Sequence, residues 1–235
     1  MKKIARQLGN SFKINMPPIT HRNAKFTNAS QAVLNAENLA FAYPGQNLFA
    51  DWSASIGPGV TLLRGGDGRG KTTLLRLLAG ELAAQAGRLQ IKGTRLDEQP
   101  VAYQRQVFWT APRTDAHDAL TTDAWLESLR QRYPSLDMQV WTRLIDGLSL
   151  TPHQGKPVYM LSTGTKRKLW LAGAFASGAA VTLLDEPFAA LDKPSIQVVT
   201  ELLQEAAQHP TRAWIVAHHE APEGVELAGV IDLGE

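Results

Sequence analysis

The sequence predicts an α/β fold with a mostly parallel central sheet, and three observations support this. From Val33 onward, segments typical of strands alternate with segments typical of helices, which is the order found in parallel α/β proteins. A glycine-rich turn at residues 65–70 joins a buried strand directly to a helix. The 235 residues, 44% of them hydrophobic, suffice for one sizeable core. We therefore expect one domain over residues 33–235.

The predicted elements follow in order along the chain. Residues 60–63 predict a buried strand, and residues 71–79 predict a helix that ends at Gly80. Between about residues 100 and 160, helical stretches that contain tryptophan and glutamine are broken by prolines, which predicts an inserted helical lobe. The predicted helices run over 123–132, 139–148 and 195–208, and two further strands over 181–184 and 213–217.

The first 32 residues differ from the rest in charge. They carry six basic side chains and no acidic one, so the net charge of +2 for the whole chain leaves −4 for the remainder. We expect residues 1–32 to form a basic, disordered extension, and the alternative is a membrane-surface or targeting role. The mildly acidic remainder argues against a nucleic-acid partner, and no nucleic acid is expected.

The composition also bears on the compartment. The chain contains no cysteine, which excludes disulfides and thiolate metal sites and fits a reducing compartment. No apolar stretch approaches the roughly 18 to 20 residues that cross a bilayer, and no apolar segment of the signal-peptide type follows the basic start. We therefore expect a cytoplasmic chain that serves any membrane process from the membrane surface.

The turn at residues 65–72 matches the phosphate-binding pattern G-x-x-x-x-G-K-[ST]. Its glycines let backbone N–H groups point at phosphate oxygens, and the start of the helix adds partial positive charge. Lys71 is expected to reach the β- and γ-phosphates of ATP, and the Thr72 hydroxyl to ligate Mg²⁺. The alternative is a plain glycine-rich turn. The candidate nucleotide contacts here are Gly65, Gly66, Asp67, Gly68, Arg69, Gly70, Lys71, Thr72 and Thr73.

Two adjacent carboxylates follow the apolar strand at residues 181–184. Hydrolysis of a nucleotide needs one acid near the metal ion and one near the attacking water. We assign Asp185, at the end of the strand, to Mg²⁺, and Glu186 to the water as general base. An acidic strand-to-turn pair without chemistry is the alternative.

A third motif carries a family resemblance. Leu161-Ser162-Thr163-Gly164-Thr165, about 20 residues before the carboxylates, resembles the L-S-G-G-Q signature of ATP-binding cassette (ABC) ATPases. The resemblance implies that Ser162 and Gly164 contact the γ-phosphate held by the partner monomer. The sequence departs from the signature at Thr163 and Thr165, which puts the strength of dimer closure in question.

Further segments match the family in the expected order. Tyr43 resembles the aromatic residue that stacks on adenine, with a core aromatic as the alternative. The segment Ala190-Leu191-Asp192 resembles the D-loop at the dimer interface, with a helix cap as the alternative. The family's switch histidine, which contacts the γ-phosphate, corresponds to His218 or, as the alternative, to His219.

One segment departs clearly from the family. Residues 107–113 occupy the place of the Q-loop, and Arg113 stands where the family has a glutamine that senses the metal ion and couples the site to the membrane partner. A guanidinium has no lone pair for a cation. Either the coupling is altered here or Arg113 is a loop residue without a catalytic part.

The resemblance covers residues 33–235 and implies an ABC-type P-loop NTPase with an antiparallel β subdomain and an inserted helical subdomain. It implies an ATPase that dimerises with itself or with a similar domain and drives a transmembrane permease subunit. Such a subunit lies peripherally on the cytoplasmic face of the inner (plasma) membrane. Among subfamilies, the haem exporter of cytochrome c maturation is the most similar. The alternatives are a soluble ABC ATPase that acts on nucleic acid or protein complexes, and a nucleotide kinase.

Overall fold

The computed structural model describes residues 24–26 and 32–234, and its centre is a six-stranded sheet with the strand order β1-β10-β4-β9-β8-β7. Five neighbouring strands run parallel, and only β1 is antiparallel to its neighbour. The expected parallel central sheet of an α/β fold is therefore confirmed. The strands are β1 (Ala24–Phe26), β4 (Gly59–Arg64), β7 (Val107–Phe108), β8 (Val181–Asp185), β9 (Ala213–Ala217) and β10 (Leu227–Asp232).

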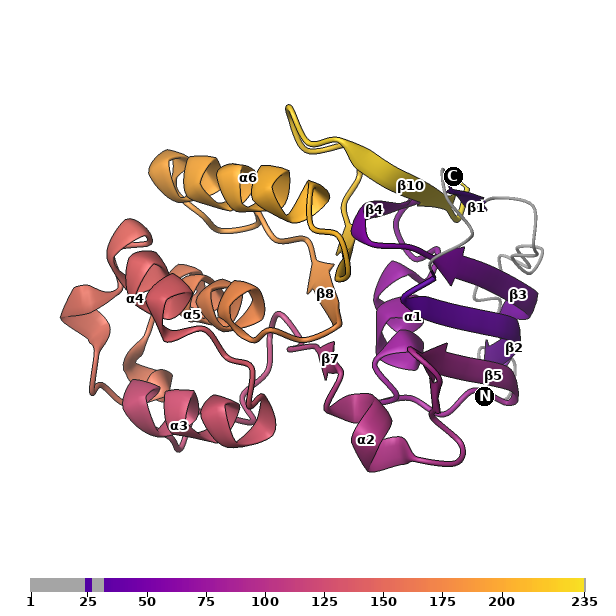
Figure 1. Ribbon diagram of the computed structural model, residues 1–235, viewed down its shortest axis with the longest axis horizontal. Coiled ribbons are helices and arrows are strands. Elements are labelled where there is room, and N and C mark those ends of the chain that lie inside the picture. The colour runs from indigo at the N-terminus through magenta and orange to yellow at the C-terminus, as the bar shows by residue number, and fades with distance from the viewer. Residues whose placement is uncertain (1–23, 27–31, 235) are drawn as a thin grey trace, which may run out of the picture.

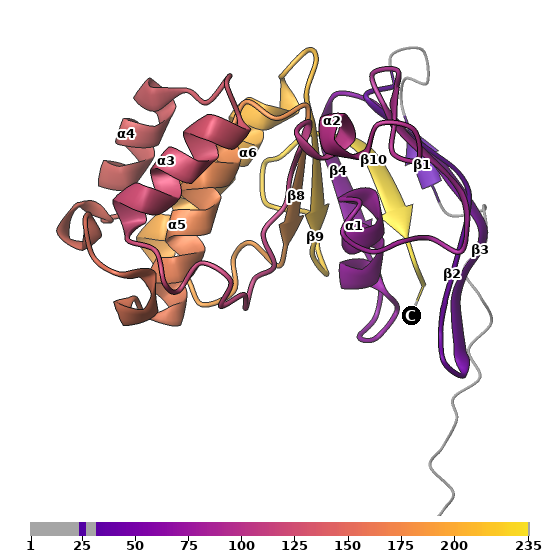
Figure 2. The same ribbon diagram turned by 90° about the horizontal axis from the view of Figure 1, so that it is seen from below.

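A second, antiparallel sheet has the order β3-β2-β5-β6. Helix α1 (Lys71–Leu78) lies between the two sheets, and Figure 2 shows it beside β4 with β2 and β3 beyond it. Both sheets and α1 contribute to one buried cluster because four leucines of this short helix are buried on several sides. The strands are β2 (Leu34–Tyr43), β3 (Gln46–Ile56), β5 (Ala86–Ile91) and β6 (Thr94–Arg95).

The other face of the central sheet is covered by α6 (Lys193–Ala207), whose apolar side packs with strand residues such as Trp214 and Val216. Beyond it, three helices form a lobe, seen on the left of Figure 1. A group of tryptophans holds this lobe together, with the Trp125 and Trp170 ring centroids 4.7 Å apart. The lobe helices are α3 (Thr122–Arg132), α4 (Met138–Gly147) and α5 (Thr163–Ala176).

The lobe begins and ends later than the expected 100–160. Helix α2 (Pro100–Gln104) contacts β6 and β7, and residues Val107 and Phe108 pair with Val181 and Thr182 in the central sheet. At the other end, α5 belongs to the lobe through its contacts with α4. None of the helices within residues 24–26 and 32–234 has the length and apolar character needed to cross a bilayer.

The expected disordered extension over residues 1–32 does not hold for Ala24–Phe26. These three residues pair with Gly229, Val230 and Ile231 of β10. Without them, β10 would leave a row of backbone N–H and C=O groups unpaired at the edge of the sheet, so pairing there is favoured. The rest of the predicted extension, apart from residue 32, lies outside the described residues.

Candidate nucleotide-binding and hydrolysis site

The phosphate-binding loop connects β4 to α1 at the edge of the sheet where the parallel strands end. Gly70, the residue before the helix, has a φ of +93°, a conformation that side chains disfavour. A Cβ atom at Gly70 would also lie 3.3 Å from the Phe49 ring. Asp67 and Gly68 form the exposed turn at the tip of the loop. Glycine at position 70 therefore permits the tight turn that leaves the first N–H groups of α1 available to an anion.

The ammonium of Lys71 lies inside this loop. Its Nζ donates hydrogen bonds to the Gly65 carbonyl oxygen at 2.7 Å and to the Gly66 carbonyl oxygen at 3.2 Å. The loop is also held from outside, because the Gly66 N–H donates to the Gly234 carbonyl at 2.9 Å. Hydrogen bonds between two charged groups are stronger than those to a neutral carbonyl. A phosphate in the loop could therefore take over the Lys71 ammonium from the two carbonyls.

Thr72 and Asp185 meet at the start of α1. The Thr72 hydroxyl donates to the Asp185 carboxylate at 2.7 Å, although the two residues are 113 positions apart in the chain. Burial raises the pKa of Asp185, an effect that the Thr72 hydrogen bond opposes. A hydroxyl and a carboxylate are hard oxygen donors of the kind that Mg²⁺ selects, so this pair fits the ion expected from the sequence.

Glu186 and His218 form the next pair along the sheet edge. His218 Nδ1 and the Glu186 carboxylate lie 2.7 Å apart, and because an ionised carboxylate only accepts, Nδ1 is the donor in this contact. His218, rather than His219, makes this hydrogen bond. Glu186 has a φ of +46°, an uncommon left-handed conformation that costs roughly 1–3 kcal/mol in a non-glycine residue. The surrounding contacts must therefore hold this residue in place.

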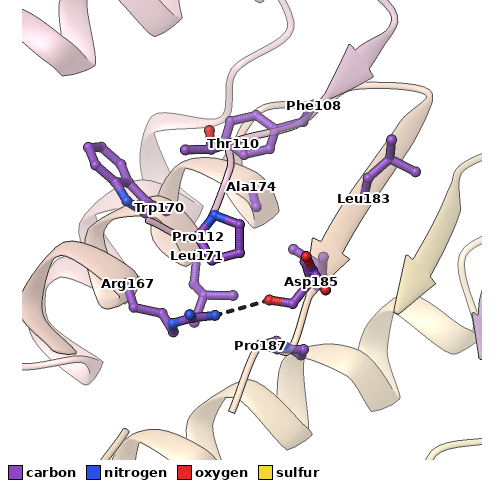
Figure 3. A pocket seen from close by; sticks show the side chains of 11 residues that line it. Phe108, Thr110, Pro112, Arg167, Trp170, Leu171, Ala174, Leu183, Asp185 and Pro187 are labelled. Carbon is purple, nitrogen blue, oxygen red and sulfur yellow. Dashed lines mark hydrogen bonds between the residues drawn. The ribbon is translucent and has the colours of Figure 1, made fainter. Parts of the chain in front are cut away.

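Arg167 on α5 supplies such contacts, and the sequence analysis did not find it. Its Nη1 donates to the backbone carbonyls of Asp185 at 3.0 Å and Glu186 at 2.7 Å, as the dashed line to Asp185 in Figure 3 indicates. The residue is only 8% exposed, and burial lowers its pKa while the two carboxylates oppose that effect. The only available sequence signal was its place in the basic run Lys166-Arg167-Lys168, which does not reveal that the middle residue points inward.

We expect Arg167→Met to lower the kcat of ATP hydrolysis about 10- to 100-fold, because loss of both hydrogen bonds lets the Glu186 backbone move by a fraction of an ångström. The KM for ATP should stay within about threefold, since Arg167 is not in the phosphate-binding loop. Steady-state kinetics on folded protein measures both quantities. Arg167→Lys, which keeps the positive charge and a single donor nitrogen, should restore part of the rate. Unchanged kcat in folded Arg167→Met would show that these hydrogen bonds do not position Glu186.

Tyr43 lies at the end of β2 beside the loop. Its hydroxyl is 3.5 Å from the Thr73 hydroxyl, and its ring packs edge-on against Phe41 with centroids 4.9 Å apart. The residue is 38% exposed, so it is not part of the core. One ring face next to the phosphate-binding loop is thus in a position to take a flat ligand.

Ser162 and Gly164 lie on a different element, at the start of α5 in the helical lobe. The Ser162 hydroxyl accepts from the Thr165 N–H at 3.1 Å and lies 2.8 Å from the Thr165 hydroxyl, so threonine at this departure from the family pattern joins the helix cap. A Cβ atom at Gly164 would lie 2.7 Å from the Ala190 carbonyl oxygen. Glycine therefore allows the signature segment to approach the D-loop segment closely.

Two other predicted residues have clear surroundings. Asp192 caps α6 by accepting from the Ser195 N–H at 2.9 Å, which is the alternative considered for the D-loop segment, and it also pairs with Lys168 at 2.7 Å. Arg113 is exposed, and its charge contributes to lowering the pKa of Arg167. Its neighbours Thr110 and Pro112 line a small cavity of about 30 Å³ against Asp185 (Figure 3). Both roles considered for Arg113, altered coupling and a loop residue without a catalytic part, stay predictions.

Comparisons with solved structures agree with this fold. The chain aligns with the ATP-binding subunit of an ABC transporter with a TM-score of 0.70 at 24% identity, over 79% of both chains. It aligns with CbiO1 of Clostridium perfringens, part of the CbiONQ ABC transporter complex, with a TM-score of 0.60 at 21% identity, over 81% of this chain and 80% of that one. At these identities the likeness supports the ABC-type fold.

Sequence comparisons also identify the family. The chain is 32% identical over 190 residues to the cytochrome c biogenesis ATP-binding export protein CcmA of Pseudomonas syringae pv. syringae (strain B728a), over 79% of this chain and 88% of the relative. It is 31% identical over 203 residues to the taurine import ATP-binding protein TauB of Pseudomonas entomophila (strain L48), over 84% of this chain and 77% of the relative. The profile of the ABC transporter family matches residues 50–189. With more than half of its length matched by this profile, the chain belongs to the ABC transporter family.

Proposed function

We propose that the chain is the ATP-binding and ATP-hydrolysing subunit of an ABC transporter, and that it drives a separate transmembrane permease subunit. The observation that carries the proposal is the meeting of three strand ends. Lys71 and Thr72 follow β4, Asp185 ends β8 with Glu186 behind it, and His218 follows β9. The contacts of Lys71 with Gly65, of Thr72 with Asp185 and of Glu186 with His218 support a phosphate site, a metal site and a base at adjacent strand ends.

The chemistry assigned to these groups is hydrolysis of ATP to ADP and phosphate. The Lys71 ammonium and the loop N–H groups would hold the β- and γ-phosphates. Glu186 would take a proton from water while the water oxygen bonds to the γ-phosphorus and the bond to the β–γ bridging oxygen breaks. Mg²⁺, held by Thr72 and the neighbouring Asp185, would neutralise negative charge on the phosphates. His218 would keep the Glu186 carboxylate oriented through the 2.7 Å hydrogen bond.

The position of Ser162 and Gly164 on the helical lobe supports a dimer. They start α5 in the lobe, whereas Lys71 starts α1, which lies beside the antiparallel sheet (Figure 1). A helix N-terminus with a serine cap suits an anion, and the anion it would serve is the γ-phosphate bound to the partner monomer. We propose that two copies, or one copy and a similar domain, enclose two ATP molecules in this way.

A cleft of about 320 Å³, lined in part by Val107, Trp109, Thr110 and Ala111 of the segment 107–113, is a candidate contact for the permease. Glu81, Trp109 and Arg132 line it, and the Trp109 indole donates to the Glu81 carboxylate. The family resemblance assigns coupling to this segment, which supports docking here and a peripheral location on the cytoplasmic face of the inner membrane. One relative is named for export and the other for import. We therefore propose that the permease, rather than this chain, selects the transported molecule.

Mg²⁺-dependent ATPase activity of the purified chain tests the proposal. The wild type should hydrolyse ATP in Mg²⁺ and stop when EDTA removes the ion. Thr72→Val deletes the hydroxyl at nearly constant volume, so it should raise the Mg²⁺ concentration needed for half-maximal rate about tenfold or more. Thr72→Ser keeps the hydroxyl and is the matched control. Hydrolysis that is independent of Mg²⁺, or a Thr72→Val variant with wild-type Mg²⁺ dependence, would contradict the assignment of Thr72.

A further inference from the structure

A second group of metal-binding side chains lies next to the proposed Mg²⁺ position. Glu186, His218 and His219 each offer a ligand atom, and these atoms all lie within 4.8 Å of one another. We propose that they form an inhibitory site for a transition-metal ion of the Zn²⁺ type. Its existence rests only on these three side chains, whereas its effect on hydrolysis rests on the function proposed above.

The geometry brings the three groups close without a metal ion. The Glu186 carboxylate and His218 Nδ1 are 2.7 Å apart, and the His218 and His219 ring centroids are 4.1 Å apart. Zinc bonds of about 2.0–2.2 Å put neighbouring ligand atoms roughly 3.3 Å apart in a tetrahedral site. The separations here exceed that by at most about 1.5 Å, and the Glu186–His218 pair is about 0.6 Å closer than that, so a small opening of this pair and a side-chain rotation of the third group are enough to form the site.

His219 is the side chain that can make this rotation. Its side chain is 67% exposed, against 16% for His218 and 40% for Glu186. Its Nε2 lies 4.0 Å from the Glu220 carboxylate, which is the limit of an ion pair and holds the ring weakly. The more buried pair therefore provides a fixed half of the site, and His219 closes it from the solvent side.

The donor atoms separate this site chemically from the Mg²⁺ position. Two imidazole nitrogens and one carboxylate oxygen suit Zn²⁺, Ni²⁺ or Cu²⁺, and they match the three protein ligands of zinc sites that keep a fourth position for water. Thr72 and Asp185 offer only oxygen, which suits Mg²⁺. We therefore expect Mg²⁺ to bind at Thr72 and Asp185, and Zn²⁺ to bind at the adjacent site.

Occupation of the site would block hydrolysis rather than nucleotide binding. The metal ion takes an oxygen lone pair of Glu186 that the attacking water needs, and it displaces the proton shared between His218 Nδ1 and Glu186, which passes to solvent. The Lys71 ammonium and the loop glycines are not ligands of this site. A nucleotide should therefore still bind to the metal-loaded protein, and a chelator should restore its activity.

Binding is measured first, on the full chain without nucleotide. Co²⁺ serves as the probe, because a tetrahedral site gives it strong visible absorption, and Zn²⁺ then displaces it in competition. His219→Asn should weaken Zn²⁺ binding at least tenfold and abolish the Co²⁺ band. His153→Asn, in the helical lobe, is the matched control and should change neither. Equal Zn²⁺ affinity in wild type and His219→Asn would overturn the site.

Inhibition is measured next, in Mg²⁺ and ATP with free Zn²⁺ set by a metal buffer because ATP itself binds Zn²⁺. The wild type and His153→Asn should lose activity as Zn²⁺ rises, and His219→Asn should keep wild-type Mg²⁺-dependent activity and need at least tenfold more Zn²⁺ for the same loss. If the chain shows no ATPase activity, the proposed function fails while the Co²⁺ result still decides the site. Equal inhibition of His219→Asn and wild type would overturn the inhibitory role.

Discussion

Glu186→Gln is expected to lower ATP turnover by a factor of about 10² to 10⁴, the usual contribution of a general base. Glutamine has nearly the same shape, and its amide oxygen can still accept the hydrogen bond that His218 Nδ1 donates at 2.7 Å. It cannot take a proton from water. The phosphate-binding loop and the Thr72–Asp185 pair are unchanged, so the Kd for ATP should stay within about threefold.

The same variant should accumulate as an ATP-bound dimer. Ser162 and Gly164 would still close over the partner's γ-phosphate, but without hydrolysis the closed state would not be released. Size measurements with and without Mg·ATP check this, alongside a turnover assay. Glu201→Gln removes an exposed carboxylate of α6 that accepts a hydrogen bond from Gln197, and it is the matched control. Normal turnover by Glu186→Gln would remove Glu186 from the role of base.

The strands that the sequence predicted best are those buried on both faces. The predicted strand at 213–217 coincides with β9, and the one at 181–184 lacks only Asp185 of β8. Helices cover both faces of this sheet, so its strands appear as continuous apolar runs, which a single sequence reveals directly. The helix at 71–79 was predictable for a local reason too, since Gly70 and Gly80 mark its two ends.

The features that the sequence did not reveal depend on distant partners. Strand β7 has only Val107 and Phe108, too few residues for a recognisable pattern, and it exists because β8 lies beside it. Strand β1 likewise follows from the open edge of β10. The inward position of Arg167 depends on where α5 crosses the end of β8. A basic residue in a helix is usually exposed, and here the carbonyls of Asp185 and Glu186 accept from the buried guanidinium.

In the candidate site too, the sequence predicted some contacts, and others are visible only in the structure. The motif pattern predicted the meeting of Thr72 with Asp185, because a nucleotide site requires both residues at one position. The choice between His218 and His219 stayed open in the sequence, since neighbouring residues at a strand end can turn either way. The 2.7 Å hydrogen bond to Glu186 favours His218. The second histidine becomes informative only once its ring is seen beside the first.

Lys71→Ala is expected to raise the Kd for ATP about 10- to 100-fold and to abolish measurable hydrolysis at ATP concentrations that saturate the wild type. The lost interaction is a charge-assisted hydrogen bond to phosphate, worth about 1.5–3 kcal/mol, and each 1.4 kcal/mol corresponds to a factor of ten. Nucleotide titration of the purified chain, followed by fluorescence or calorimetry, measures the loss. Lys156→Ala, which removes an exposed lysine of the helical lobe, is the control for net charge.

The ligand-free contacts of Lys71 make a second readout possible. Its ammonium donates to the Gly65 and Gly66 carbonyls, so alanine should also loosen the loop and lower the thermal midpoint slightly in the absence of nucleotide. The wild type should gain stability when ATP is added, because a ligand that binds only the folded state raises its midpoint, and Lys71→Ala should gain almost none. Equal ATP-dependent stabilisation of both proteins would mean that the nucleotide does not bind through this loop, despite its phosphate-binding motif.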